Sequence, residues 1–501
     1  MPSLADLVRQ GRPVPHHRPW ARTVLDTDGW NAAIAGLAEG RWSLLGLWGE
    51  VAAVHMALFD EAAAEIAVAS LDCPGGNFPS VGRHHAPAQR PERAIQDLWG
   101  LEPVGATDSR PWLDHGRWGV HHPLAGRQPA TTPPAAYAFL PSQGESLHQI
   151  PVGPVHAGII EPGHFRFTAN GETVVRLEAR LGYVHKGVAG LMAGATLERG
   201  AKLAGRTSGD SVVAYGLAFA RAAEAACAAE IPPRAHWLRA LMAELERLAN
   251  HFGDIGAICN DASFALMNAH CGVLREQVLR AAEACFGHRL MRDRVVPGGV
   301  AVDLEEHGDA VLRSLVDALR KRFPGLVQLY DNTASLLDRT VGTGVLQPAL
   351  ARQFSAGGYV GRASGRAFDA RRSPGYPPYD SLSFEVPLRQ DGDVNARVWI
   401  RIHEVEQSLA LIEQILDRLP GGLFRVDLAG AGEGMALVEG FRGDVLAWLR
   451  LSADGRVESC HLRDPSWFQW PLLEAVIEGN IVADFPLCNK SFNCSYSGHD
   501  L

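Results

Sequence analysis

Residues 237–253 read WLRALMAELERLANHFG, and this stretch is the strongest indication of the fold. Its apolar side chains recur every three or four residues, which is the spacing of one face of an α-helix, and the preceding Pro232-Pro233 suits a helix start. A second stripe of the same period occupies residues 398–416 and ends before Pro420-Gly421-Gly422. Two such stripes predict a helical bundle. The first stripe consists of Leu238, Leu241, Leu245, Leu248 and Phe252.

Strand patterns lie on both sides of these helices. Residues 164–169 and 173–177 are joined by Asn170-Gly171, which predicts a β-hairpin because both turn residues tolerate positive φ. Strand-like runs return at residues 445–451 and 457–462. We therefore expect a mainly α bundle domain with a small α+β flank.

The N-terminal part has a different pattern. Short apolar runs at residues 42–47, 51–58 and 66–71 alternate with a helical piece at 93–99, which predicts an α+β sandwich. Residues 125–144, AGRQPATTPPAAYAFLPSQG, are typical of a linker. Because 501 residues exceed what one core usually holds, we expect domains at 1–124 and 150–501, with a linker at 125–149.

Composition excludes several classes of function. The formal charge is −9, from 47 Lys and Arg against 56 Asp and Glu, which argues against a nucleic-acid partner. We find no apolar run of the ~18 residues that a spanning helix needs and no signal-peptide core near the N-terminus. We therefore expect a soluble, cytoplasmic chain. Its eight cysteines form no C-x-x-C pair, so they predict neither a disulfide scaffold nor a closely spaced thiolate site.

Many short motifs are similar to those of one family, in the right order along residues 90–125 and 150–501. In the N-terminal part, residues 92–101 (ERAIQDLWGL) and 114–118 (DHGRW) resemble the C-type subunit of respiratory complex I. The remainder resembles the D-type subunit and the related large subunits of group 4 [NiFe] hydrogenases. The matching stretches are GPVH at 153–156, GYVHKG at 182–187, PPRA at 232–235, ELERLANH at 244–251, PGGV at 297–300, GTGV at 342–345, RASG at 362–365, GDVNAR at 392–397 and EGFRG at 439–443.

The fused order, C-type then D-type, resembles the large subunits of formate hydrogenlyase and hydrogenase-4. This resemblance implies a membrane-associated redox complex. Its expected partners are a small subunit that holds a [4Fe-4S] cluster, a ferredoxin-like subunit and antiporter-like membrane subunits. It also implies a peripheral position on the inner face of the cell membrane.

The resemblance also locates the hydrogenase metal ligands. The first ligand motif falls on residues 206–211, and the terminal motif falls on residues 493–500. Ser208, Ser211, Ser495 and Gly498 then occupy the four thiolate positions. A shift by one residue would put Cys494 on one of them, which still leaves the other thiolates missing. Because a serine hydroxyl is a poor ligand for a soft metal, we expect no [NiFe] site and no cofactor held by this chain.

A quinone is the alternative ligand that the resemblance suggests, with His156 and His164 as candidate binding residues. The family's quinone histidine falls on Ile160 by direct counting and on His164 after a short gap. The expected tyrosine near residues 204–206 is absent. Because both groups would donate hydrogen bonds and protons to a reduced ring, ordinary quinone reduction is in doubt.

Six residues are candidates for chemistry at this place: Glu161, His164, Arg206, Asp210, Glu439 and Arg442. We expect Asp210 to accept protons, with a pKa tuned by Arg206. The structural alternative for Asp210 is a helix N-cap or an ion pair that fixes the helix after it. For Glu161 and His164 it is a polar loop exposed to solvent or to the partner subunit, and for Glu439 and Arg442 it is a buried pair. Four arginines within residues 362–372 could grip an anion or an acidic partner, or form a solvated or interface loop.

The sequence thus supports three hypotheses. The first is a large-subunit homologue without [NiFe], in a hydrogenase-4-related complex that couples electron transfer to proton or ion movement. The second is an active hydrogenase or a quinone-reducing subunit of the NADH-quinone oxidoreductase type. The third is a purely structural or assembly subunit.

Overall fold

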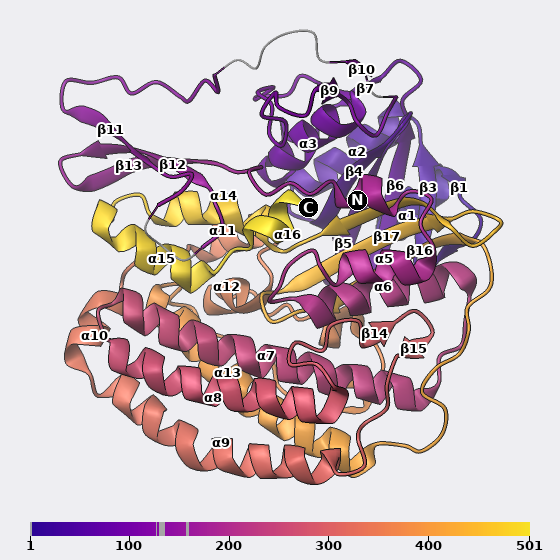
Figure 1. Cartoon of the computed structure of the whole chain (residues 1–501). Helices are drawn as coiled ribbons and strands as arrows, with labels where there is room; N and C mark the ends of the chain where they lie inside the picture. Colours follow the sequence, from indigo (N-terminus) through magenta and orange to yellow (C-terminus); the bar gives the residue numbers. More distant parts are fainter. Residues whose placement is uncertain (1–2, 127, 130–135, 157–159) are drawn as a thin grey trace.

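A computed structural model describes residues 3–126, 128–129, 136–156 and 160–501. Its lower half in Figure 1 is a layer of long helices: α7 (Pro233–Asp261), α8 (Ala265–Phe286), α9 (Gly308–Asp331) and α13 (Val394–Arg418). The helices predicted from both apolar stripes are confirmed, because the stripe residues are buried in α7 and α13. Pro233 occupies the first turn of α7.

A four-stranded sheet lies above this layer in Figure 1. Strands β16 (Gly432–Glu439), β17 (Asp444–Leu451) and β18 (Val457–Arg463) pair antiparallel, which confirms the strand pattern predicted there. The helix α6 (Val212–Cys227) packs against the sheet. It approaches so closely that a Cβ on Gly434 would lie 1.9 Å from the carbonyl oxygen of Ala222. Glycine is therefore required at position 434.

The fourth strand of this sheet is β2 (His17–Arg18), which pairs parallel to β16. It comes from the N-terminal part, whose own sheet has the order β1-β3-β6-β5-β4. The strands are β1 (Arg12–Pro13), β3 (Ala21–Leu25), β4 (Ser43–Glu50), β5 (Ala53–Asp60) and β6 (Glu65–Asp72). The accompanying helices are α1 (Leu4–Gln10), α2 (Thr27–Ala38) and α3 (Gln89–Trp99).

The two sheets share a hydrophobic core. One face of the N-terminal sheet packs on β16 and β17, and the rings of Trp48 and Trp448 lie 5.6 Å apart within it. Its members also include Leu45, Ala57, Phe59, Ile66, Val68, Met435, Leu437 and Leu446. The C-terminal sheet therefore covers one face of the N-terminal sheet. The domain boundaries at residues 124 and 149 stay a prediction.

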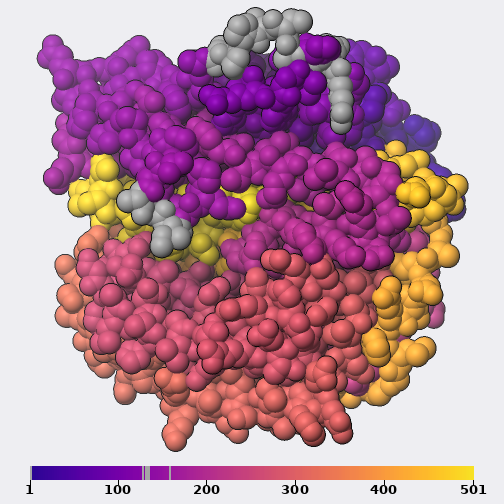
Figure 2. All heavy atoms as spheres, in the orientation of Figure 1, coloured from indigo at the N-terminus to yellow at the C-terminus, as the bar shows by residue number. Residues whose placement is uncertain are grey.

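A three-stranded sheet protrudes at the upper left of Figures 1 and 2. It contains β11 (Leu147–Val152), β12 (His164–Asn170) and β13 (Thr173–Arg180). The predicted hairpin is confirmed, although its turn residues are Gly171 and Glu172, because Asn170 already pairs with Thr173. Part of the predicted linker, residues 127 and 130–135, lies outside the described residues.

The remaining elements are short. Within the described residues, no helix combines the length and the apolar character that crossing a membrane would need. The short helices are α4 (Val188–Met192), α5 (Leu197–Ala204), α10 (Ala334–Thr340), α11 (Pro348–Gln353), α12 (Gly358–Ala363), α14 (Ser466–Val476), α15 (Phe485–Phe492) and α16 (Tyr496–Asp500). The short strands are β7 (Asn77–Pro79), β8 (Glu102–Val104), β9 (Val120–His121), β10 (Gln128–Pro129), β14 (Val295–Val296) and β15 (Gly299–Val300).

Candidate functional site

The structure brings the two predicted ligand segments together. Ser208 and Ser211 precede α6, and Ser495 is the N-cap of α16. The hydroxyl oxygens of Ser208 and Ser495 lie 3.0 Å apart, although 287 positions separate these residues in the chain. We call Ser208, Ser211, Ser495 and Gly498 the serine cluster.

The hydrogen bonds of the cluster run in one direction. Ser208 donates its proton to Asp210 at 2.6 Å, so the Ser495 hydroxyl is the donor to Ser208. Ser495 in turn accepts the N–H of Gly498 at 2.8 Å, which caps α16. The hydroxyls of Ser208, Ser211 and Ser495 therefore each have a hydrogen-bond partner.

Gly498 lies against a second buried pair. The Tyr215 hydroxyl donates to Asp464 at 2.9 Å, and a Cβ on Gly498 would lie 2.4 Å from an oxygen of that carboxylate. Position 498 therefore has no room for a side chain without movement of Asp464. Neither Tyr215 nor Asp464 was identified from the sequence, since nothing in their spacing links them.

Asp210 is paired with Arg442, and our prediction of Arg206 as its partner is wrong. The Arg442 guanidinium donates to the Asp210 carboxylate and, at 3.3 Å, to the Ser211 hydroxyl. Burial opposes ionisation of Asp210, but the charge of Arg442 outweighs it and holds the pKa of Asp210 below its usual range. Arg206 instead forms a half-exposed ion pair with Asp293.

The predicted N-cap role of Asp210 is also wrong. Ser211 is the N-cap of α6, and the first N–H groups of the helix donate to Glu246 of α7. Burial raises the pKa of Glu246 to about 8, although two backbone N–H groups donate to it. Beside Asp210 and Glu246 lies a cavity of about 20 Å³, which is room for one water molecule.

Glu439 and Arg442 do not form the pair that we predicted. The Glu439 carboxylate accepts from Arg362 at 2.9 Å and from the backbone N–H of Ala370 at 3.0 Å. Burial and the nearby Asp369 raise the pKa of Glu439, against the attraction of Arg362. Glu439 and Arg442 thus belong to different ion pairs.

Arg362 joins Glu439 to a larger buried network that the sequence analysis missed. Glu244, Arg247 and His251 lie on α7 at positions i, i+3 and i+7, within its buried face. His251 bonds to Glu404 of α13 at 2.7 Å, and Glu404 accepts from Arg362 at 2.8 Å. The signal was present in residues 244–251, where charged side chains interrupt an apolar helix face.

The arginines of residues 362–372 interact with other groups of the same chain. Arg362, Arg366 and Arg371 are buried and pair with acidic side chains, such as Arg371 with Glu244 at 3.0 Å. The predictions of an anion grip and of a solvated loop are therefore wrong for these three residues. Their charges are balanced because bare guanidinium groups would be costly to bury.

The remaining candidates lie at the edge of the cluster or away from it. Glu161 is exposed and accepts the backbone N–H of Ser497 at 2.9 Å, next to the cluster. His164 is buried at the start of β12, bonds to the Gly153 carbonyl at 3.1 Å and accepts from Arg166 at 3.3 Å. The exposed loop predicted for His164 is thus wrong. His156 is half-buried.

Cys494 does not replace Ser495 in the cluster. It is buried, and burial raises the pKa of its thiol well above the usual range, against the charge of Arg442. The hydroxyl of Ser495 faces Ser208. Of these two neighbouring residues, Ser495 is therefore the one whose side chain contacts the first predicted ligand segment.

Chemically, the serine cluster with Asp210 and Arg442 can relay protons. Together these residues supply hydroxyls, one carboxylate and one guanidinium, all joined by hydrogen bonds. Protonated hydroxyls are poor ligands for soft metals. The side chains therefore resemble a proton-holding network more than a thiolate metal site.

Comparison with known proteins gives consistent relatives. The family model described as "Respiratory-chain NADH dehydrogenase, 49 Kd subunit" matches residues 265–431. Formate hydrogenlyase subunit 5 of Escherichia coli (strain K12) is 32% identical over 446 residues, which cover 86% of this chain and 78% of that protein. Hydrogenase-4 component G of the same organism is 30% identical, with 89% and 80% covered.

A solved structure has the same fold over most of the chain. It comes from the membrane-bound sulfane sulfur reductase, described as an archaeal respiratory membrane complex. The TM-score is 0.68 at 26% identity, over 71% of this chain and 99% of that chain. The fold described above is therefore that of complex I 49 kDa subunits and hydrogenase large subunits.

Proposed function

The chain belongs to the family of large subunits shared by group 4 hydrogenases and complex I-like complexes, and on this basis we propose that it is a large-subunit homologue without a [NiFe] centre. It acts within a membrane-associated, hydrogenase-4-related redox complex. Its relatives are subunits of formate hydrogenlyase and hydrogenase-4, and the solved structure similar to it comes from a respiratory membrane complex.

The observation that carries the proposal is the hydrogen bond between Ser208 and Ser495. It lies between the two segments that would each supply thiolates to a [NiFe] centre, and its hydroxyls are already committed to each other and to Asp210. Gly498, the fourth ligand position, has no donor atom and no space for one. Nickel needs several thiolates at such a site, so these residues do not fit it.

We extend the proposal to the partners that the resemblance implies. A small subunit with a [4Fe-4S] cluster packs on this chain, a ferredoxin-like subunit delivers electrons, and antiporter-like membrane subunits move protons or ions. The chain is then peripheral on the inner face of the membrane. Quinone binding through His156 or His164 stays a prediction.

In this role the chain's own residues would relay protons rather than bind a metal. Asp210 is the best placed of them, because its side chain is 33% exposed and lies beside a cavity that has room for one water. Arg442 keeps it ionised, and two hydroxyls donate to it. This arrangement could pass a proton between the serine cluster and solvent.

The test is elemental analysis of the complex purified with all its subunits. We expect iron from the partner's clusters but far less than one nickel per complex. Stoichiometric nickel would contradict the proposal. In the same preparation, Asp210→Asn should lower ion-coupled turnover, whereas Arg206→Gln at the half-exposed Asp293 pair should leave it unchanged. Unchanged turnover in both variants would favour a purely structural subunit.

A further inference from the structure

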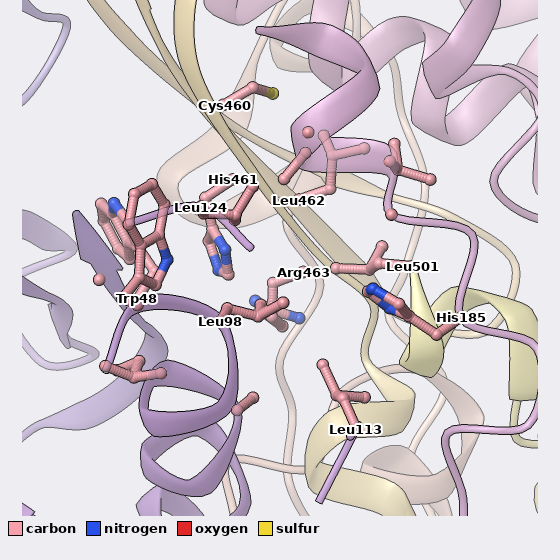
Figure 3. A pocket seen from close by; sticks show the side chains of 18 of the residues that line it. Trp48, Leu98, Leu113, Leu124, His185, Cys460, His461, Leu462, Arg463 and Leu501 are labelled. Carbon is pink, nitrogen blue, oxygen red and sulfur yellow. The ribbon is translucent and has the colours of Figure 1, made fainter. Parts of the chain in front are cut away.

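A cavity of about 420 Å³ lies where the N-terminal part meets the C-terminal part, and no residue of the serine cluster lines it. Figure 3 shows it between α3 and β4 on one side and β18, α4 and the chain's last residue on the other. Its volume is within the range that holds small organic ligands. Much of its wall is apolar, from Ala94, Ile95 and Leu98 of α3 and from Val188, Leu191 and Met192 of α4.

Three buried ring nitrogens in this wall have no hydrogen-bond partner within residues 3–126, 128–129, 136–156 and 160–501. They are Nε1 of Trp48, Nε1 of Trp467 and Nε2 of His461. Trp48 and Trp467 are 3% and 5% exposed, and an indole N–H can only donate. Because a buried donor without an acceptor is costly, their gathering in one cavity calls for acceptor atoms inside it.

The charges around the cavity favour a neutral occupant. Burial lowers the pKa of His461 to about 3, so its imidazole is neutral near pH 7. Arg463 is already matched by the carboxylate of Asp444 and by two backbone carbonyls. Lys186 donates to the Thr207 carbonyl at 3.0 Å. The charge of Arg463 is therefore balanced, and burial disfavours the charged form of Lys186, because it lowers the pKa of that ammonium group.

The rings point to a flat ligand. Trp48 and His461 are stacked, with ring centroids 5.0 Å apart and planes 9° from parallel, and Figure 3 shows them side by side. Trp99 and Trp118 also line the cavity. Aromatic walls of this kind provide extended contact with planar rings.

We propose that this cavity binds a neutral, apolar small molecule whose carbonyl oxygen accepts a hydrogen bond from the indole N–H groups of Trp48 and Trp467. The carbonyl can belong to an aromatic ketone or to an acyl ester, which share the acceptor but differ in flatness. The proposal does not depend on the role of the serine cluster.

Binding is measured on the full chain with prodan, a neutral naphthyl ketone whose fluorescence shifts to the blue in apolar surroundings. We expect saturable binding with this blue shift. Three competitors then define the ligand: 2-acetylnaphthalene, 2-ethylnaphthalene and methyl decanoate. The ketone should displace prodan at about fivefold lower concentration than 2-ethylnaphthalene, as expected for one hydrogen bond. Stronger competition by methyl decanoate than by the ketone would assign the site to acyl esters.

Variants separate this site from unspecific binding. Two substitutions fill the cavity, Leu98→Trp and Ala94→Phe, and each should weaken prodan binding at least tenfold. Because Leu98 is only half-buried, Leu98→Trp should disturb the fold less. Val273→Phe on the exposed surface of α8 is the matched control and should bind as the unchanged chain does. Trp48→Phe with Trp467→Phe keeps ring contact but should abolish the preference for 2-acetylnaphthalene over 2-ethylnaphthalene.

Two results would overturn the proposal. Prodan binding that is absent, or equally strong in Leu98→Trp and Ala94→Phe, would mean that prodan does not bind in this cavity. A ketone preference that survives loss of both indole donors would mean that Trp48 and Trp467 do not recognise the carbonyl.

Discussion

Arg442 is the residue that holds the serine cluster together. Its guanidinium donates to the carboxylate of Asp210, the hydroxyl of Ser211 and the carbonyl of Asn493, so it joins the loop before α6 to the C-terminal segment. The side chain is buried, and burial of a lone carboxylate or carbonyl is unfavourable. Loss of Arg442 would therefore leave several groups unpaired at once.

Arg442→Gln should lower the free energy of unfolding by on the order of 3 kcal/mol, the cost of breaking a buried ion pair. The matched control is Arg206→Gln, whose ion pair with Asp293 is half-exposed and should contribute about 0.2–1 kcal/mol. Urea unfolding of the full chain, followed by circular dichroism, measures both. Equal losses in the two variants would show that Arg442 is not a key partner of Asp210.

At the scale of elements, α16 carries the C-terminal half of the cluster. This helix has only five residues, and its cap and its packing both use the cluster: Ser495 accepts from Gly498, and Gly498 lies against Asp464. A helix this short is only marginally stable by itself. Its position therefore depends on tertiary contacts.

Gly498→Ala should destabilise the chain by about 1–3 kcal/mol, because the new methyl group would overlap the Asp464 carboxylate and the Ser495 hydroxyl. Gly209→Ala is the matched control, since its Cβ would enter open space beside the same cluster. Thermal unfolding of both variants measures the difference. If the Gly498→Ala variant were as stable as the Gly209→Ala variant, the segment around α16 would accommodate the methyl group by a small shift.

Some elements could be predicted from the sequence, and others could not. The helices α7 and α13 and the hairpin β12–β13 were predictable, because period and turn residues are local signals. The partner of Asp210 was not, because Arg442 lies 232 positions away and Arg206 is only four positions away. The family alignment did identify Ser208 and Ser495, although no local sequence pattern could predict that they are in contact.

At the scale of the whole molecule, the N-terminal sheet belongs to two cores. Along β5, Met56 and Leu58 pack into the larger core, whereas Ala57 and Phe59 pack against the C-terminal sheet. Apart from His55, the buried residues of β5 are apolar on both faces, so the sequence does not reveal which neighbour covers each face. The parallel pairing of β2 with β16 adds a backbone link between the two parts.

Because of this shared core, we expect the N-terminal and C-terminal parts to unfold together. Trp448→Ala should cost about 3–5 kcal/mol and lower the unfolding temperature of both parts. The buried thiols Cys73, in the N-terminal part, and Cys259, in α7, report on each part when thiol labelling is followed during heating. Both should become reactive at one reduced temperature, whereas the exposed-site control Val175→Ala should leave that temperature unchanged. Earlier exposure of Cys259 while Cys73 stays protected would show that the two parts are separate folding units, and that the sheet contact is only an interface between them.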